Sequence, residues 1–554
     1  MVVGEVVVDI MIPLLMSRII DVGIQNRDVG YVARVGGLMV LCALVALAFG
    51  ALSGRFAAVA SMGFAKNVRR KLFYKIQDFS FANMDKFSTA SLVTRLTTDV
   101  TNTQMAYMMC IRMLVRAPIM LICATAMTVS INARLALVFF VAIPVLGTVL
   151  YLIATRAYPR FQAMLTRYDG LNARVEEGLI AIRVVKAFVR HEYEEEKFEK
   201  EADALRAAQK RAEKLVILNM PAMQLTMYAC ILSILWFGGN MIVGGTMGTG
   251  ELMSFISYVT QILMSLMMLS MVFVNLVLSR ASVRRITEVL DEVPDIDDSA
   301  ADPGAQLKDG SIEFKDVSFS YSHKADNLTL QHIDLSIKSG ETIGIIGGTG
   351  SAKTTLVQLI PRLYDIDGGE LLVGGRDIKE YPLETLRDGV AMVLQKNVLF
   401  SGTIDDNLRW GDEHASEDQI REACRAADAD GFVSAFPDGY ETDLGQGGVN
   451  VSGGQKQRLC IARALLKRPK IVILDDSTSA VDTATDSRIR GALRTQLAGT
   501  TTIIIAQRIT SVMDADRIVV LDDGKISAVG THDELMQSSE IYREVYESQQ
   551  KGVA

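Results

Sequence analysis

The sequence predicts a multidomain protein, with an all-α domain of six transmembrane helices followed by an α/β domain that contains a P-loop. Three observations predict this fold class. Long uncharged apolar stretches are concentrated before about residue 280, and hydrophobic residues make up 49% of the 554 residues. An acidic stretch rich in Pro, Gly and Asp follows, which is typical of a linker. From Ser311 onward, short apolar runs alternate with helical patterns, as in α/β proteins. We place the domains at residues 1–290 and 311–554, with the linker at 291–310.

Five stretches without a charged residue approach or exceed the ~20 residues that span a bilayer as a helix. They are Val35–Gly54, Ala117–Ala133, Leu135–Thr155, Leu215–Gly250 and Leu252–Ser279. A buried helix of a soluble protein would explain any one of them, but not all five together.

The first residues, Met1–Ile20, are also apolar but carry Glu5, Asp9 and Arg18. They lack the basic start and the small-residue cleavage site of a signal peptide. We interpret them as the remainder of a first spanning helix, so six spans form three hairpins. The long inner connections, 66–106 and 156–214, carry seven and thirteen Lys/Arg residues, against three at most in the outer loops. This asymmetry places the inner connections and the C-terminal domain in the cytoplasm.

The inner connections have the composition of charged helices rather than of loops. Glu194 with Lys197 and Glu196 with Lys200 stand at the spacing of helical ion pairs. Two more apolar patches, Ser88–Asp99 and Gly178–Phe188, interrupt these connections. We expect both patches to form tips that contact another part of the protein in the cytosol.

In the second half, strand patterns are expected at 312–319, 390–394, 470–474 and 501–505, and helices at 417–426 and 483–496. Short buried strands that alternate with helices predict a largely parallel sheet. The six cysteines and five histidines are scattered, so neither a disulfide framework nor a zinc site is indicated.

One glycine-rich stretch lies between an apolar run, Thr342–Ile346, and a helical pattern that begins at Thr355. In this setting, backbone N–H groups and the helix N-terminus bind phosphate, Lys353 adds a positive charge, and the Thr354 hydroxyl is placed to ligate Mg²⁺. The residues expected to contact ATP are Gly347, Gly348, Thr349, Gly350, Ser351, Ala352, Lys353, Thr354 and Thr355. Ala352 stands where the pattern has its second glycine. If this position needs a positive φ, the methyl group costs ~1–2 kcal/mol; otherwise the change is nearly neutral.

A second set of motifs indicates which class of ATP-binding protein this is. The apolar run Ile471–Leu474 ends in Asp475 and Asp476, and Asp475 is placed to hold Mg²⁺ as a Walker B carboxylate. Just upstream, Ser452, Gly453, Gly454 and Gln455 precede a helical pattern. This order resembles the signature of ATP-binding-cassette (ABC) proteins. Within the resemblance, Gln395 corresponds to the Q-loop, Tyr321 to the aromatic that stacks on adenine, and Ser479–Asp482 to the D-loop.

Six spans followed by one such domain resemble a half-size ABC exporter along essentially the whole chain. The resemblance implies ATP and Mg²⁺ as cofactors, with the metal near Thr354, Gln395 and Asp475. It also implies that two nucleotide-binding domains close head to tail. Each ATP then lies between one chain's phosphate loop and the other chain's signature, Ser452–Gln455. The two apolar tips would lie near coupling helices that rest on the nucleotide-binding domains.

Two catalytic positions depart from the family pattern. Asp476 stands where a Glu normally positions the attacking water, and its side chain is shorter by one CH₂, roughly 1.5 Å. Misplacement on the order of 1 Å can cost ~10²-fold in rate. Gln507 stands where a His normally contacts the γ-phosphate, and its amide donates hydrogen bonds but carries no charge. We therefore expect an ABC-type ATPase coupled to transport whose own site binds ATP but hydrolyses it slowly.

The combination of retained ATP-binding residues and altered hydrolytic residues resembles the degenerate-site subunit of a heterodimeric multidrug-type exporter. In such an exporter, the partner supplies the catalytic Glu and His. A slow homodimeric exporter, an ATP-gated regulatory or channel-like protein and an importer-type protein are the alternatives. The expected substrate is drug-like, lipid-like or a peptide, and the Met-rich spans suit adaptable binding or ordinary packing. Membrane lipid is an expected partner, and nucleic acid is not. We expect a multi-pass protein of a bacterial inner (plasma) membrane.

Overall fold

The structure is a computed structural model that describes residues 1–324, 326–477, 483–496 and 498–551. The chain divides into two compact units. The first, which we call the helical unit, comprises Met1–Gln77 and Thr89–Glu292. The second, the α/β unit, comprises Asp78–Ser88 and Val293–Ala554. A short segment from the N-terminal half therefore belongs to the unit formed by the C-terminal half.

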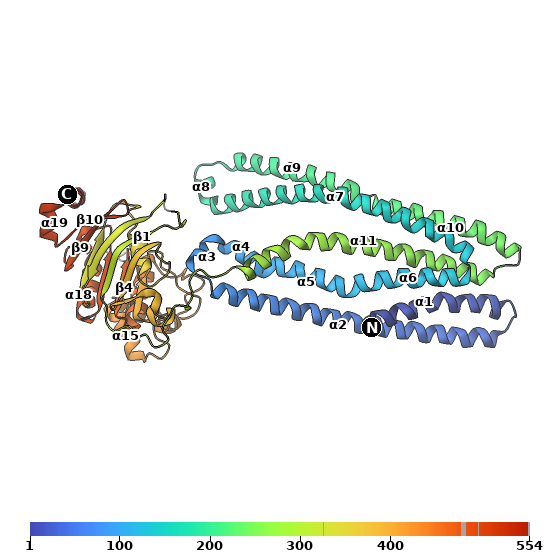
Figure 1. Cartoon of the computed structure of the whole chain (residues 1–554), viewed down its shortest axis with the longest axis horizontal. Coiled ribbons are helices and arrows are strands. Elements are labelled where there is room, and N and C mark those ends of the chain that lie inside the picture. Colours follow the sequence, from blue (N-terminus) through green and yellow to red (C-terminus); the bar gives the residue numbers. More distant parts are fainter. Residues whose placement is uncertain (325, 478–482, 497, 552–554) are drawn as a thin grey trace. The chain divides into compact units, whose positions relative to one another are not determined.

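The helical unit consists of long α-helices, several of which run side by side (Figure 1). They are α1 (Val2–Arg18), α2 (Val29–Gln77), α4 (Thr89–Thr94), α5 (Val100–Met109), α6 (Val115–Ile131), α7 (Ala133–Ile180), α8 (Ile182–Ala187), α9 (His191–Val216), α10 (Asn219–Val243) and α11 (Thr249–Asp291). Short π-helical turns lie at Ile19–Ile24, Arg95–Asp99 and Cys110–Leu114. α7 packs along α9 and α10, and α1 packs along α2 and α11.

Five helical stretches in the described part of the chain are long and apolar enough to cross a membrane. They are Val29–Gln77, Thr89–Ile131, Ala133–Ile180, His191–Val243 and Thr249–Asp291, and each contains all or most of one of the predicted apolar stretches. The 17-residue helix α1 packs against α2, α6 and α11 as the sixth helix. α2 has 49 residues, which is roughly 74 Å at 1.5 Å per residue, more than twice the hydrocarbon thickness of a bilayer. Its remaining turns extend beyond the membrane, as predicted for the inner connections.

Small residues allow the helices to approach closely. On α2, the buried Ser53, Ala57, Ser61 and Ala65 recur every four residues and form one stripe along the helix. Such stripes let helix backbones pack tightly in a membrane, where the hydrophobic effect does not drive helices together. The predicted ion pairs on α9 are also confirmed, because Lys197 lies 3.5 Å from Glu194 and Lys200 lies 2.7 Å from Glu196.

The first cytosolic tip was predicted about ten residues too late in the sequence. Asp78–Ser88, which contains the short helix α3 (Phe81–Lys86), packs within the α/β unit, whereas most of the predicted patch Ser88–Asp99 belongs to the helical unit. Leu92 is buried there, and the Arg285 Nε atom of α11 donates a 2.7 Å hydrogen bond to the buried Asp99 carboxylate. The apolar composition of this patch therefore reflects packing between helices. The second predicted tip does form a short helix, α8.

The α/β unit contains two sheets with helices around them. Its strands are β1 (Ile312–Phe319), β2 (Leu330–Ile337), β3 (Thr342–Ile346), β4 (Gly368–Val373), β5 (Arg376–Asp377), β6 (Val390–Val393), β7 (Ile471–Asp475), β8 (Thr501–Ile505), β9 (Arg517–Asp522) and β10 (Lys525–Gly530). Its α-helices, besides α3, are α12 (Lys353–Leu359), α13 (Leu383–Gly389), α14 (Ile404–Leu408), α15 (Glu417–Ala426), α16 (Asp430–Ser434), α17 (Gly453–Leu466), α18 (Thr483–Gln496), α19 (His532–Ser538) and α20 (Glu540–Lys551).

The predicted parallel sheet has the strand order β10-β9-β3-β8-β7-β6, and only β10 pairs antiparallel in it. A separate four-stranded antiparallel sheet, β2-β1-β4-β5, was not predicted. Of its strands, only β1 was predicted, at 312–319; the others lack the short apolar runs between helices that mark the parallel sheet. One hydrophobic cluster joins the two sheets around α12, and another packs α14, α15 and α17 against β6 and β7.

Candidate functional site

The strand order brings together motifs that lie far apart in the sequence. β8 lies between β3 and β7, and all three run parallel, with Ile345 opposite Ile505 and Ile505 opposite Asp475. The carboxyl ends of parallel strands meet at one edge of the sheet, which is where α/β proteins bind ligands. The glycine-rich loop, the paired carboxylates and Gln507 therefore all emerge at the same edge.

The glycine-rich loop between β3 and α12 has the backbone that its motif predicts. A Cβ atom at Gly347 would collide with the Leu521 carbonyl oxygen, and Gly350 has a φ of +86°. Ala352 also adopts the left-handed conformation, with a φ of +68°. The position does require a positive φ, so alanine is strained there, with a typical cost of ~1–2 kcal/mol.

The Lys353 ammonium lies inside this loop. Its Nζ atom donates hydrogen bonds to the carbonyl oxygens of Gly347, at 2.9 Å, and Gly348, at 2.7 Å. Burial lowers the pKa of Lys353, although the neighbouring carboxylates Asp475 and Asp476 oppose that effect. A desolvated cation framed by backbone dipoles is suited to bind the phosphates of a nucleotide.

Two of the three residues predicted to hold Mg²⁺, Thr354 and Asp475, are in contact. Thr354 Oγ1 donates a 2.9 Å hydrogen bond to Asp475 Oδ2. Burial raises the pKa of Asp475, and the hydrogen bond from Thr354 opposes this shift. A hydroxyl and a carboxylate supply the hard oxygen ligands that Mg²⁺ prefers, so these residues fit the metal. Gln395, the third predicted ligand, follows β6 by two residues and is exposed.

The two residues that depart from the family pattern contact each other. Gln507 Nε2 donates a 2.9 Å hydrogen bond to Asp476 Oδ2. The Asp476 backbone is also fixed, since its N–H donates to the Ile505 carbonyl at 3.0 Å and its φ is +49°. The carboxylate where the family has its catalytic Glu is thus engaged by the amide where the family has its His.

The predicted adenine-stacking residue, Tyr321, lies beside the phosphate loop helix. Its hydroxyl is 3.0 Å from Thr355 Oγ1, and its ring packs edge-on against Phe319 and Tyr364. The Tyr321 side chain remains 48% exposed, which leaves aromatic surface available for a base. Tyr364 was not identified from the sequence, because its role depends on contacts formed only in the fold.

The signature residues form the start of α17. Ser452 is its N-cap: its Oγ atom accepts from the Gln455 N–H at 3.3 Å, and its own N–H donates to Gln455 Oε1 at 2.9 Å. Ser452 and Gly453 are exposed. α17 packs in the cluster around α14 and α15, whereas the phosphate loop packs in the cluster that joins the two sheets. The predicted D-loop residues, Ser479–Asp482, lie outside the described residues.

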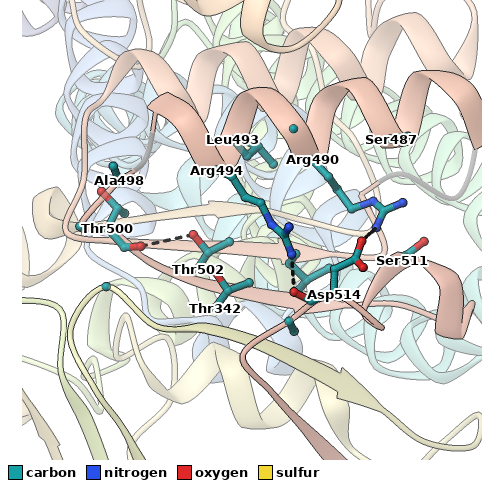
Figure 2. Close-up of a pocket in the computed structure, with 15 residues that line it drawn as sticks. Thr342, Ser487, Arg490, Leu493, Arg494, Ala498, Thr500, Thr502, Ser511 and Asp514 are labelled. Carbon is teal, nitrogen blue, oxygen red and sulfur yellow. Dashed lines mark hydrogen bonds and ion pairs between the residues drawn. The ribbon is translucent and has the colours of Figure 1, made fainter. Parts of the chain in front are cut away.

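A polar cavity of about 270 Å³ lies elsewhere in the α/β unit, beside the amino ends of β3 and β8 (Figure 2). Arg490 and Arg494 extend from α18 toward Asp514. Arg490 Nη1 lies 3.2 Å from Asp514 Oδ2, and the Arg494 guanidinium donates to the Asp514 carbonyl oxygen. These cations already have partners, and the cavity contains none of the nucleotide motifs. The predicted nucleotide site lies at the opposite edge of the sheet, at the carboxyl ends of β3, β7 and β8.

Comparisons with known proteins agree with this geometry. Residues 1–266 match the family model for the ABC transporter transmembrane region, and residues 330–479 match the model for ABC transporters. YfiB of Bacillus subtilis, an uncharacterized ABC transporter ATP-binding protein, is 39% identical over 98% of this chain and 94% of that protein. An ATP-dependent lipid A-core flippase of Desulfotalea psychrophila is 33% identical over 87% of this chain and 84% of that protein.

A solved structure shows the same fold. A bacterial Atm1-family ABC exporter with ATP bound superimposes with a TM-score of 0.81, covering 99% of this chain and 97% of that one at 24% identity. The chain carries one transmembrane region followed by one ABC domain, and it belongs to the ABC transporter family as a half-size protein with the exporter fold.

Proposed function

We propose that this chain is one half of an ATP-driven exporter, paired with a different half-transporter, and that its own site binds ATP but hydrolyses it slowly. The observation that carries the proposal is the 2.9 Å hydrogen bond from Gln507 to Asp476. This hydrogen bond occupies one oxygen of the carboxylate that would otherwise face the attacking water. Asp476 is also shorter than Glu, so both its reach and its engagement by Gln507 work against activation of water.

The groups that bind nucleotide are retained. Lys353 supplies the phosphate-binding cation, Thr354 and Asp475 fit Mg²⁺, and Tyr321 offers exposed aromatic surface to adenine. The metal, when bound, would neutralise charge on the phosphates. A site that keeps its binding groups and alters its hydrolytic groups acts as a slow clamp.

Two exposed surfaces support the pairing with a second chain. Ser452 and Gly453 present a helix N-terminus to solvent, where it is suited to a phosphate group from outside the chain. The second exposed surface lies around α8, the second predicted cytosolic tip. There the apolar residues Ile180 and Phe188 are 79% and 73% exposed. Exposed apolar groups of this size at a tip are typical of an interaction surface. A second chain would cover both surfaces.

For the substrate, we propose an amphipathic, lipid-like molecule. The name of the similar Desulfotalea psychrophila protein describes a flippase of lipid A-core. The spans of this chain contain many Met residues, which line adaptable apolar surfaces. We expect the chain and its partner to move this substrate outward across a bacterial inner membrane, with the α/β unit in the cytoplasm.

The test of slow hydrolysis measures ATPase turnover of the purified full chain, alone and with the half-transporter encoded beside it. We expect low turnover alone and at least ten-fold more in the pair. In the single chain, Asp476→Glu restores only part of the turnover, because Gln507 still lacks a charge. The double variant Asp476→Glu/Gln507→His raises turnover at least ten-fold.

A matched control is Gln537→His, the same change at an exposed position on α19. It should leave turnover unchanged. Family-typical turnover from the unaltered single chain would contradict the proposal. So would full recovery in Asp476→Glu alone, since that would show that Gln507 is adequate at the switch position.

A further inference from the structure

The buried Tyr364 connects Tyr321, the predicted adenine-stacking residue, to the segment Asp78–Ser88, which we call the tip. Tyr364 follows α12, is 8% exposed, and donates a 2.8 Å hydrogen bond from its hydroxyl to Asp85 Oδ2. Burial and the Asp85 carboxylate raise the pKa of Tyr364 above its usual range, so the phenol remains a proton donor. A hydrogen bond to a charged acceptor is among the stronger ones in proteins.

The same ring packs against the adenine-stacking residue. The ring centroids of Tyr364 and Tyr321 are 5.1 Å apart with an interplanar angle of 89°, which is the favoured edge-to-face geometry. Phe81 of α3 packs on Tyr364 as well, with centroids 6.0 Å apart. Tyr364 thus contacts Tyr321 on one side and two residues of the tip on the other.

The tip has little freedom to move independently of these contacts. Ser80 caps α3 through Asn83 and also donates to the Asp295 carboxylate. Asn83 Nδ2 donates to the Val293 carbonyl at 3.3 Å, and Ala82 packs against the hydrophobic cluster that joins the two sheets. Both ends of this segment continue into long helical stretches of the helical unit, since α2 ends at Gln77 and the stretch Thr89–Ile131 begins with α4.

From these contacts we infer that Tyr364 is a positioning residue through which the tip Asp78–Ser88 senses the purine base of the nucleotide, separately from its phosphates. A base stacked on the exposed surface of Tyr321 restricts that ring. Restriction passes to Tyr364 through the edge contact and to Asp85 through the hydrogen bond. Ordering one member of such a chain of contacts lowers the entropic cost of ordering the next. The inference rests on ATP binding at Gly347–Thr354, but not on slow hydrolysis or on the identity of the partner.

The test compares ATP with ribose 5′-triphosphate, which has the phosphates but no base. Backbone hydrogen exchange is measured on the full chain in lipid nanodiscs. In the unaltered chain, ATP should slow exchange over residues 78–88 at least three-fold more than ribose 5′-triphosphate does. In Tyr364→Phe, which keeps the ring but removes the hydroxyl, the two compounds should protect the tip equally. Asp85→Ala removes the acceptor of the same hydrogen bond, so it should also abolish the difference between the two compounds.

The matched control is Tyr381→Phe. Tyr381 is also buried in the α/β unit, and its hydroxyl donates 2.8 Å to the Val373 carbonyl, so a merely structural loss of one tyrosine hydrogen bond is reproduced there. This variant should keep the difference between the two compounds. A base-dependent difference that survives in Tyr364→Phe, or its absence in the unaltered chain, would overturn the inference. Failure of ATP to protect Gly347–Thr354 would overturn the proposed nucleotide binding as well, and the two failures are therefore distinguishable.

Discussion

Ala352 shows that the loop conformation prevails over a side chain that opposes it. The residue has a φ of +68°, where glycine is the favoured residue. The close approach of Gly347 to the Leu521 carbonyl and the hydrogen bonds of Lys353 hold the loop in place on both sides. The strain at Ala352 is thus maintained by contacts that the phosphate site needs.

Ala352→Gly should stabilise the α/β unit by roughly 1 kcal/mol. Relief of the left-handed strain contributes ~1–2 kcal/mol, and the more flexible unfolded chain removes ~0.4–1 kcal/mol of that gain. For a unit of this size, the Tm of the full chain should rise by about 2–4 °C. The control is Ala301→Gly, at a residue outside the positive-φ positions, which should not raise the Tm. An unchanged or lowered Tm in Ala352→Gly would show that the position is not strained.

At this scale, the sequence predicted the local backbone well where the motif is contiguous, as in the strand β3, the glycine-rich turn and the helix α12. A strand, a glycine-rich turn and a helix in direct succession specify the positions of Lys353 and Thr354 without knowledge of the rest of the fold. The hydrogen bond between Gln507 and Asp476 could not be predicted in this way. It depends on the adjacency of β7 and β8 and on the rotamers of two side chains that are 31 residues apart.

At the scale of elements, the two short tip helices differ in what covers them. α3 packs within the α/β unit of its own chain through Ala82 and the contacts of Ser80 and Asn83. The apolar side chains around α8 remain exposed within the helical unit. This difference is the basis for expecting that α8 docks on the partner.

Phe188→Glu should therefore impair assembly without unfolding the chain. Phe188 is 73% exposed, so the charge is tolerated in the single chain, but burying an unpaired carboxylate in an interface is costly. We expect at least a ten-fold loss of partner-stimulated ATPase activity and weaker co-purification. Phe198→Glu is the control, because Phe198 is an exposed phenylalanine on α9 outside the tip. Normal activity of Phe188→Glu in the pair would argue against docking by α8.

The displaced prediction of the first tip has a physical explanation. Apolar content marks burial, but it does not distinguish burial between helices from docking on another domain, and Leu92 is buried in the first way. The segment that does pack in the α/β unit is held partly by polar side chains, Ser80, Asn83 and Asp85, which give no hydrophobic signal. Long helices were predicted more reliably, because uncharged stretches of membrane length have few alternative interpretations.

At the scale of the whole molecule, the chain offers two nucleotide-facing surfaces with different expected uses. Under the proposed pairing, the phosphate loop would serve the chain's own ATP and the N-terminus of α17 would serve the partner's ATP. If this division holds, damage to each surface should have a different effect on the pair.

Gly453→Glu tests this division in the assembled pair. A carboxylate in the first turn of α17 favours the helix dipole, so the fold should be retained, but it repels a phosphate group. We expect the ATPase rate of the pair to fall more than ten-fold while ATP binding at this chain's own loop changes less than two-fold. Gly431→Glu is the control, since Gly431 on α16 is exposed and has open space around it. Retained activity in Gly453→Glu would contradict a signature that acts on the partner's nucleotide.

The order of synthesis gives the Asp85–Tyr364 hydrogen bond a further consequence. The two residues are 279 positions apart, so at ~5–20 residues per second Asp85 leaves the ribosome roughly 15–55 s before Tyr364 is made. During that interval α3 has none of its contacts with Val293–Ala554, while both flanking helices are already being inserted. Assembly of the tip therefore waits for translation of the second half, and premature termination before Tyr364 leaves an uncovered segment that quality-control proteases could recognise.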